Sequence, residues 1–321
     1  MPASSKKALV GAMLANMAIA VTKFVVGGLT QSTVMIAEGI HSFVDTGDSA
    51  LMLLGESRSR RPADETHPFG YGMELYFWSF VVAMVVFGGG GGLSIYEGLR
   101  AFFHPRVLGA LWPNYLVIAA AAVFEGISLA IGLREFNAYR REKRFEGSAL
   151  AVMRASKNPA IFVTVLEDVA ALAGLAIAAV GLTFSHVLAN PAFDAIASIL
   201  IGLVLVAEAC LLGYECRGLI IGEPARPIVM SEVRLAIARH PEIGRIERLS
   251  TLQLGPDSVM LVLGIRSDPQ LKEEVLERAR ASLVADIRSA VPTVKHIVCD
   301  LAHPPTAMNG PRSDEDEVPF T

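Results

Sequence analysis

One short stretch decides how this 321-residue sequence is interpreted: residues 37–48 read AEGIHSFVDTGD, inside a hydrophobic run over residues 32–54. The run is long enough to cross a bilayer core of about 30 Å as a helix. A charged side chain near the bilayer centre costs about 2.5–3.5 kcal/mol, so lipid cannot surround its polar groups. At about 100° per residue, these groups occupy one arc of about 80° on the helix. We expect this stripe to face protein, water or an ion; it consists of Glu38, His41, Asp45 and Asp48.

Five further hydrophobic runs of about 20 residues or more accompany this one. They cover residues 8–29, 76–96, 113–133, 159–185 and 193–213. Only 19% of the residues are charged, against about 25% in soluble proteins, and 52% are hydrophobic, which excludes a disordered chain. The net charge of −4 provides no basic surface for nucleic acid. The sequence predicts an all-α bundle of six transmembrane helices at residues 1–220.

The basic residues predict the orientation of this bundle. Twelve lysines and arginines fall in the N-terminal tail and the loops on one side, whereas Arg100 and Arg106 fall on the other. Because cytoplasmic loops carry the excess of basic residues, we expect both termini in the cytoplasm. A bacterial inner membrane is the expected location, and an organelle membrane would give the same pattern.

The composition after residue 220 is that of a soluble domain. It predicts a helix at 227–239, strands at 244–254 and 258–265, a helix at 268–290 and a strand at 295–301. Gly255, Pro256 and Asp257 form a plausible hairpin connection. This order predicts a cytoplasmic α+β domain of the ferredoxin-like type at residues 221–305. Residues 306–321 contain four consecutive acids and are expected to form a disordered acidic tail.

The stripe contains the ligands that a divalent metal ion prefers. Imidazole with carboxylates favours zinc-type ions over magnesium or calcium. His41 and Asp45 lie four residues apart, so they share a helix face and can bind one ion. Asp168, in the run at 159–185, would complete a three-ligand core. The fourth position stays open between water and three side chains, namely Glu167, Thr164 and Glu38.

A buried ion-pair network that only fixes the helix register is the alternative. Lys23 in the first run and Glu125 in the fourth fit that description as a pair, so a structural and a coupling role are equally open for them. A structural or interfacial role is favoured for Glu38, Asp48, Asp194 and Glu208, of which the last two lie near the ends of their run. Several carboxylates against one lysine still leave negative charge that a cation or protons must neutralise.

Several motifs resemble the cation diffusion facilitator family. They are AEGIHSFVDT at residues 37–46, HPFGYG at 67–72 and LIIGEP at 219–224. The resemblance covers almost the whole chain except the acidic tail. Within the family, SKNP at 156–159 and VLED at 165–168 are similar to the zinc-transporter-nine branch. Most members place a histidine or aspartate four residues before the acid of the fifth span, where this chain has Thr164.

The resemblance implies a homodimeric membrane transporter that exports divalent metal, commonly zinc, in exchange for protons by alternating access. Zinc is then the substrate, and protons, the lipid bilayer and a second copy are the partners. No catalytic residue is expected, because neither HExxH nor GxSxG occurs. Transport of iron, manganese or cobalt, and a metal sensor that does not transport, are the alternatives.

The resemblance also points to secondary metal sites. In the loop after the second run, Asp64 and His67 match such a site, but Tyr71 stands where another histidine is common, and we favour a structural loop. In the soluble domain, three residues lie near positions that bind regulatory metal in some relatives, with ordinary surface roles as the alternative. These residues are His240, Asp300 and His303.

Five consecutive glycines at residues 88–92 interrupt the third run. Small residues let helices approach closely in lipid. The glycines therefore predict a dimer seam, a flexible gate or tight packing within the chain, and the sequence leaves these alternatives open.

Overall fold

The computed structural model describes residues 3–106, 109–143, 145, 147–266 and 273–302. It divides the chain into a helical unit, Met1–Glu223, and a second unit, Pro224–Thr321, that holds a three-stranded sheet. His303 and the predicted acidic tail lie outside the described residues.

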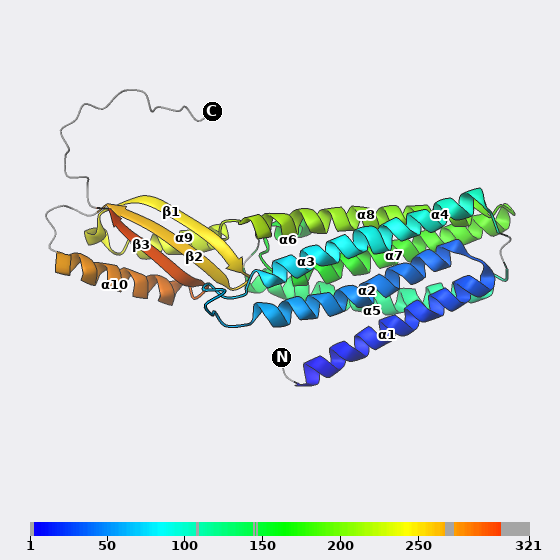
Figure 1. The fold of residues 1–321 in the computed structure, drawn as a ribbon, viewed down its shortest axis with the longest axis horizontal. Coiled ribbons are helices and arrows are strands. Elements are labelled where there is room, and N and C mark those ends of the chain that lie inside the picture. Colours follow the sequence, from blue (N-terminus) through cyan, green and yellow to red (C-terminus); the bar gives the residue numbers. More distant parts are fainter. Residues whose placement is uncertain (1–2, 107–108, 144, 146, 267–272, 303–321) are drawn as a thin grey trace, which may run out of the picture. The chain divides into compact units, whose positions relative to one another are not determined.

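The helical unit consists mainly of long helices that run alongside one another (Figure 1). They are α1 (Ala3–Thr30), α2 (Thr33–Ser59), α3 (Glu74–Val85), η1 (Val86–Gly92), α4 (Leu93–Phe103), α5 (Trp112–Glu142), α6 (Ala149–Ala155), α7 (Pro159–Val187) and α8 (Ala192–Ile221). Among the described residues, five stretches are long and apolar enough to cross a membrane: Met13–Thr30, Glu74–Phe103, Trp112–Glu142, Pro159–Val187 and Ala192–Ile221. Helix α2 is 27 residues long and carries the polar stripe.

Helix α2 occupies a central place, because it packs against α1, α3, α7 and α8. Asp194, in the first turn of α8, binds the N-terminus of α2. The Asp194 carboxylate accepts hydrogen bonds from Ser32 Oγ at 2.7 Å and from the Thr33 backbone N–H at 2.6 Å. These bonds satisfy donors that a helix start leaves unpaired. Asp194 therefore has the structural role expected of it and fixes the start of α2 against α8.

The glycine run forms a π-helix, η1, between α3 and α4. A Cβ atom on Gly91 would lie 2.9 Å from the Gly202 carbonyl oxygen of α8, and one on Gly202 would lie 2.8 Å from the Gly91 carbonyl oxygen. Real Cβ atoms do not approach this closely, so glycine is required on both sides of the crossing. At Gly91 the run therefore serves packing within the chain.

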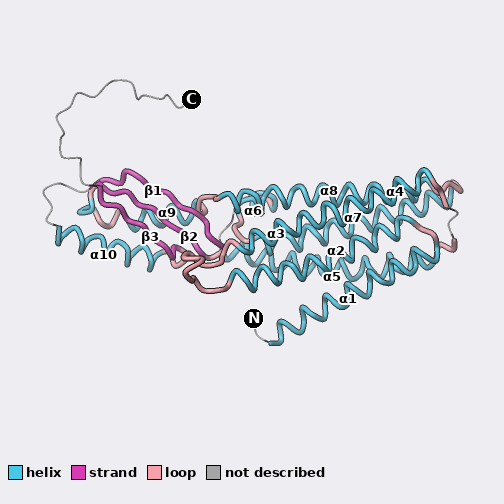
Figure 2. The backbone as a smooth tube through the Cα atoms, in the orientation of Figure 1, coloured by secondary structure: helices cyan, strands magenta, loops and turns pink. Residues whose placement is uncertain are grey.

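The second unit contains α9 (Pro227–Ile237), η2 (Pro241–Ile243), β1 (Arg245–Gly255), β2 (Ser258–Arg266), α10 (Glu273–Ala290) and β3 (Val294–Ala302). The three strands form one sheet (Figure 2), in which the central strand β2 runs antiparallel to β1 and parallel to β3. Gly255 pairs with Ser258, so the expected hairpin is present. The side chains of β2 are largely apolar on both faces, but only one face packs on the helices. The buried residues of that face alternate along the strand and are Val259, Leu261, Leu263 and Ile265.

The glycine crossing gives a stability prediction. Gly202→Ala should lower the melting temperature of the detergent-solubilised protein, because overpacking a closed crossing costs about 1–3 kcal/mol. Gly88→Ala is the matched control, since nothing lies within 4 Å of its added Cβ. Thermal unfolding followed by size-exclusion chromatography makes the comparison, and equal melting temperatures for the two variants would contradict the crossing.

Candidate metal centre

His41 and Asp45 lie on the buried face of α2. His41 is 1% exposed and Asp45 is 9% exposed, and His41 Nδ1 lies 3.3 Å from Asp45 Oδ1. This approach lacks hydrogen-bond geometry, and neither ring nitrogen of His41 has a hydrogen-bond partner among the described residues. Leaving buried polar atoms unpaired is costly. The pair therefore places an imidazole that has no hydrogen-bond partner among the described residues beside a carboxylate.

Lys23 of α1 neutralises Glu38 at the start of the stripe. Its Nζ donates to Glu38 Oε2 at 2.8 Å and to Ser42 Oγ at 2.7 Å, with Lys23 and Glu38 fully buried. The predicted pairing of Lys23 with Glu125 is therefore corrected. Lys23 and Glu38 stand at similar distances from the tight turn between α1 and α2, so they face each other across the two antiparallel helices. Glu125 on α5 stays within electrostatic range of Lys23.

The two neighbouring acids of α7 have different surroundings, because successive helical residues point about 100° apart. Asp168 accepts a hydrogen bond from Ser128 Oγ of α5 at 3.1 Å. Glu167 lies within electrostatic range of Asp45 and Asp48 of α2 and of Glu208 of α8. Thr164, one turn before Asp168, is exposed. In this conformation Asp168 therefore bonds to α5, and Glu167 lies among the acids of the neighbouring helices.

A further acid, Glu208 of α8, lies near the same level of the bundle. A Cβ on Gly174 of α7 would contact both Glu38 of α2 and Ile201 of α8, which fixes one shared level. Asp45 lies seven residues, or about two turns, after Glu38, and Glu208 lies seven residues after Ile201. Glu167 lies seven residues before Gly174, because α7 runs in the opposite direction. The charges of Glu167 and Glu208 both act on Asp45, in agreement with this placement.

The hydrophobic run ends at residue 213, which predicts a structural or interfacial role for Glu208. Helix α8 continues to Ile221, so Glu208 lies near its middle. The residue is 8% exposed. An acid inside a long apolar segment was the signal that could have identified it.

The assembled acids do not yet form a closed metal site. Within the described part of the chain, no group of three His, Cys, Asp or Glu side chains is close enough to hold one ion. The structure brings His41 and Asp45 together, with Glu167, Glu208, Glu125 and Asp48 within electrostatic range of Asp45. Asp168, the expected third ligand, instead accepts a hydrogen bond from Ser128.

The loop between α2 and α3 uses Asp64 for its own structure. Asp64 accepts hydrogen bonds from Tyr71 Oη at 2.7 Å, Thr66 Oγ1 at 2.7 Å and the His67 backbone N–H at 2.8 Å. These bonds, that of Tyr71 first, lower the pKa of Asp64 to about 2. The His67 ring stacks on Tyr71, with 4.0 Å between ring centroids. This geometry supports the structural alternative for the loop.

The described candidates in the second unit stand on different elements. His240 Nε2 lies 2.9 Å from Asp286 Oδ2 of α10. Asp300 is exposed on β3, where it pairs in register with Gly264 of β2. His303 lies outside the described residues, so the metal site expected here stays a prediction.

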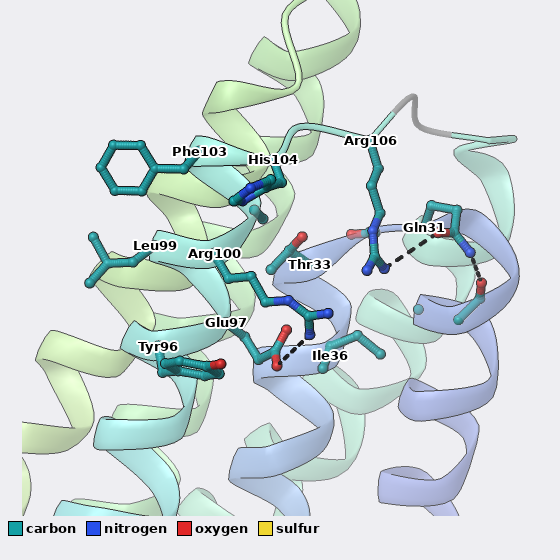
Figure 3. Close-up of a pocket in the computed structure, with 14 residues that line it drawn as sticks. Gln31, Thr33, Ile36, Tyr96, Glu97, Leu99, Arg100, Phe103, His104 and Arg106 are labelled. Carbon is teal, nitrogen blue, oxygen red and sulfur yellow. Dashed lines mark hydrogen bonds and ion pairs between the residues drawn. The ribbon is translucent and has the colours of Figure 1, made fainter.

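A cavity of about 600 Å³ lies where α2 begins and α4 ends (Figure 3). Arg100, Arg106 and His104 line it, together with Glu97. Arg100 reaches Glu97 at 3.5 Å, and Arg106 reaches Gln31 at 3.5 Å. Two guanidinium groups against one carboxylate repel a metal cation, and none of the predicted ligands lines this cavity.

The Lys23–Glu38 pair gives a second stability prediction. Lys23→Met should lower the melting temperature strongly, because removing one partner of a buried ion pair costs about 3–5 kcal/mol. Lys23→Met combined with Glu38→Leu should recover most of this loss, since no buried charge is then left alone. Thermal unfolding of both variants measures this recovery of the melting temperature. A double variant no more stable than Lys23→Met would contradict the pairing.

Comparison with known proteins agrees with this architecture. Residues 9–221 match the family model of the cation efflux transmembrane domain. The mitochondrial proton-coupled zinc antiporter SLC30A9 is 28% identical over 270 residues in Xenopus laevis, covering 84% of this chain and 48% of that protein. The human protein of that name is 30% identical over 234 residues, covering 73% of this chain and 41% of the relative.

Metal tolerance protein C4 of Arabidopsis thaliana is 29% identical over 255 residues, covering 79% of this chain and 55% of the plant protein. The chain thus spans about half the length of these relatives. The family match covers the helical unit that carries the buried histidine and acids. The chain therefore belongs to the cation efflux, or cation diffusion facilitator, family, whose transmembrane domain its residues 9–221 match.

Proposed function

We propose that this chain exports a divalent metal ion, zinc above all, in exchange for protons, through a site built on His41 and Asp45. The observation that carries the proposal is the buried pair itself: a 3.3 Å approach, with His41 lacking a hydrogen-bond partner among the described residues. The zinc antiporters to which the chain is similar support zinc and proton coupling.

Proton coupling follows from the chemistry of these ligands. A metal ion binds neutral imidazole and ionised carboxylates, so protons compete with it for the same atoms. Protons that enter from the far side would therefore help to expel the ion. The many acids around Asp45 increase the number of protons that can take part.

Ion binding would draw α7 toward α2. Asp168 is the third ligand that the sequence favours, and Glu167 lies within electrostatic range of Asp45. The fourth ligand comes from Glu167, Thr164, Glu38 or water. Helices that separate and approach around one ion provide alternating access.

We place six spans in the membrane, with α2 as the sixth helix beside the five apolar ones. At about 1.5 Å per residue, its 27 residues reach about 40 Å, more than a bilayer core of about 30 Å needs. Both termini are proposed to lie in the cytoplasm, with a bacterial inner membrane as the location. The second unit is proposed to be a ferredoxin-like domain, and two copies are proposed to form a homodimer.

Two alternatives remain worth testing. Iron, manganese or cobalt could replace zinc, because Glu167 and Glu208 add oxygen donors beside Asp45. A membrane metal sensor would bind the ion without moving it. Metal-dependent proton flux in proteoliposomes separates the transporter from the sensor, because only the transporter couples the two movements.

The transport prediction concerns His41 and Asp45. In proteoliposomes with an imposed pH gradient, His41→Ala and Asp45→Asn should each reduce zinc uptake at least about tenfold. Losing a group that only hydrogen-bonds to a metal ligand already lowers metal affinity about 10–100-fold, and losing the ligand itself should cost more. Zinc uptake is read with a fluorescent indicator inside the vesicles.

Glu56→Gln is the matched control, since Glu56 lies on the same helix and pairs with Arg60 at the end of α2. It should transport at the wild-type rate. Wild-type transport by His41→Ala or by Asp45→Asn would defeat the proposed site.

A further inference from the structure

Asp48 is a buried acid that no protein group satisfies. It is 0% exposed, and both of its carboxylate oxygens lack a hydrogen-bond partner among the described residues. Lys23 of α1, which is buried beside the stripe, is already bound to Glu38 and Ser42. Something other than these protein groups must therefore compensate this carboxylate.

Glu208 faces Asp48 from α8. Its Oε2 is buried and unpartnered within the described part of the structure, and its charge acts on Asp48, which also interacts with Asp45 and Glu167. Helices α2 and α8 pack directly against each other. Two unpartnered carboxylates thus share one buried place between two helices.

This place adjoins the His41–Asp45 pair and differs from it in chemistry. Asp48 lies about one turn beyond Asp45 and about 10 Å beyond His41 along the helix axis, so it stands at the end of the stripe away from the imidazole. It offers carboxylate oxygens without imidazole, and such donors prefer harder cations, which retain water among their ligands.

We propose that Asp48 and Glu208 form a second cation position, which binds a hard divalent ion such as Mn²⁺ together with water. The proposal rests on the proposed transport function, because the position would hold an ion next to the transport site. It assigns to α8 a role in ion handling in addition to its structural role at Asp194.

The test is the number of Mn²⁺ ions bound by the purified full-length protein in lipid nanodiscs. Equilibrium dialysis followed by electron paramagnetic resonance of the free ion gives this number. Wild-type protein should bind one more Mn²⁺ per chain than Glu208→Gln or Asp48→Asn. Any metal bound in the loop after α2 or in the second unit contributes equally to every variant and cancels in the difference, and the His41→Ala variant accounts for the neighbouring transport site.

Two controls make the result specific. Glu56→Gln, which removes an acid from the end of the same helix, should bind as many Mn²⁺ ions as the wild type. His41→Ala should also keep the ion, because its imidazole is not part of this position.

Equal Mn²⁺ numbers for the wild type and a folded Glu208→Gln or Asp48→Asn variant would overturn the proposal and indicate a protonated pair instead. Each acid is replaced separately, so one variant suffices if the other does not give a monodisperse protein. Unchanged zinc transport by His41→Ala would defeat the proposed function, whereas the Mn²⁺ number decides this inference independently.

Discussion

Buried charge must be compensated, and this constraint organises the helical unit. Lipid cannot solvate a carboxylate, so each acid on α2 needs a cation, a proton or a set of donors. At the start of the stripe, Lys23 compensates Glu38 through a direct ion pair. Further along, His41 and Asp48 have no such partner among the described residues. Stability resides at the first position, and ion handling is proposed for the positions that follow.

The sequence predicts the main elements because their signals are local. The polar stripe of α2 follows from helical periodicity, and the order of strands and helices in the second unit follows from turn residues and apolar patterns. The close approach of His41 to Asp45 follows from their spacing of four residues. No contact with another helix is needed to infer any of these features.

The features that the sequence leaves open, or predicts wrongly, depend on contacts between helices. Lys23 has Glu38 as its partner instead of Glu125, because the turn between α1 and α2 sets the register of these helices. The directions of Glu167 and Asp168 depend on the rotation of α7 about its axis, which composition does not report. Glu208 was placed at a helix end because apolar character stops before the helix does. The π-helix of the glycine run likewise depends on the crossing with α8.

X-ray absorption spectroscopy of zinc bound to the purified protein tests the central claim most directly. The account predicts one imidazole nitrogen at about 2.0 Å with carboxylate oxygens beside it, and loss of that nitrogen signal in His41→Ala. Zinc coordinated by sulfur at about 2.3 Å, from the free thiols of Cys210, Cys216 or Cys299, would contradict a site built on His41 and Asp45. An unchanged spectrum in His41→Ala would contradict it equally.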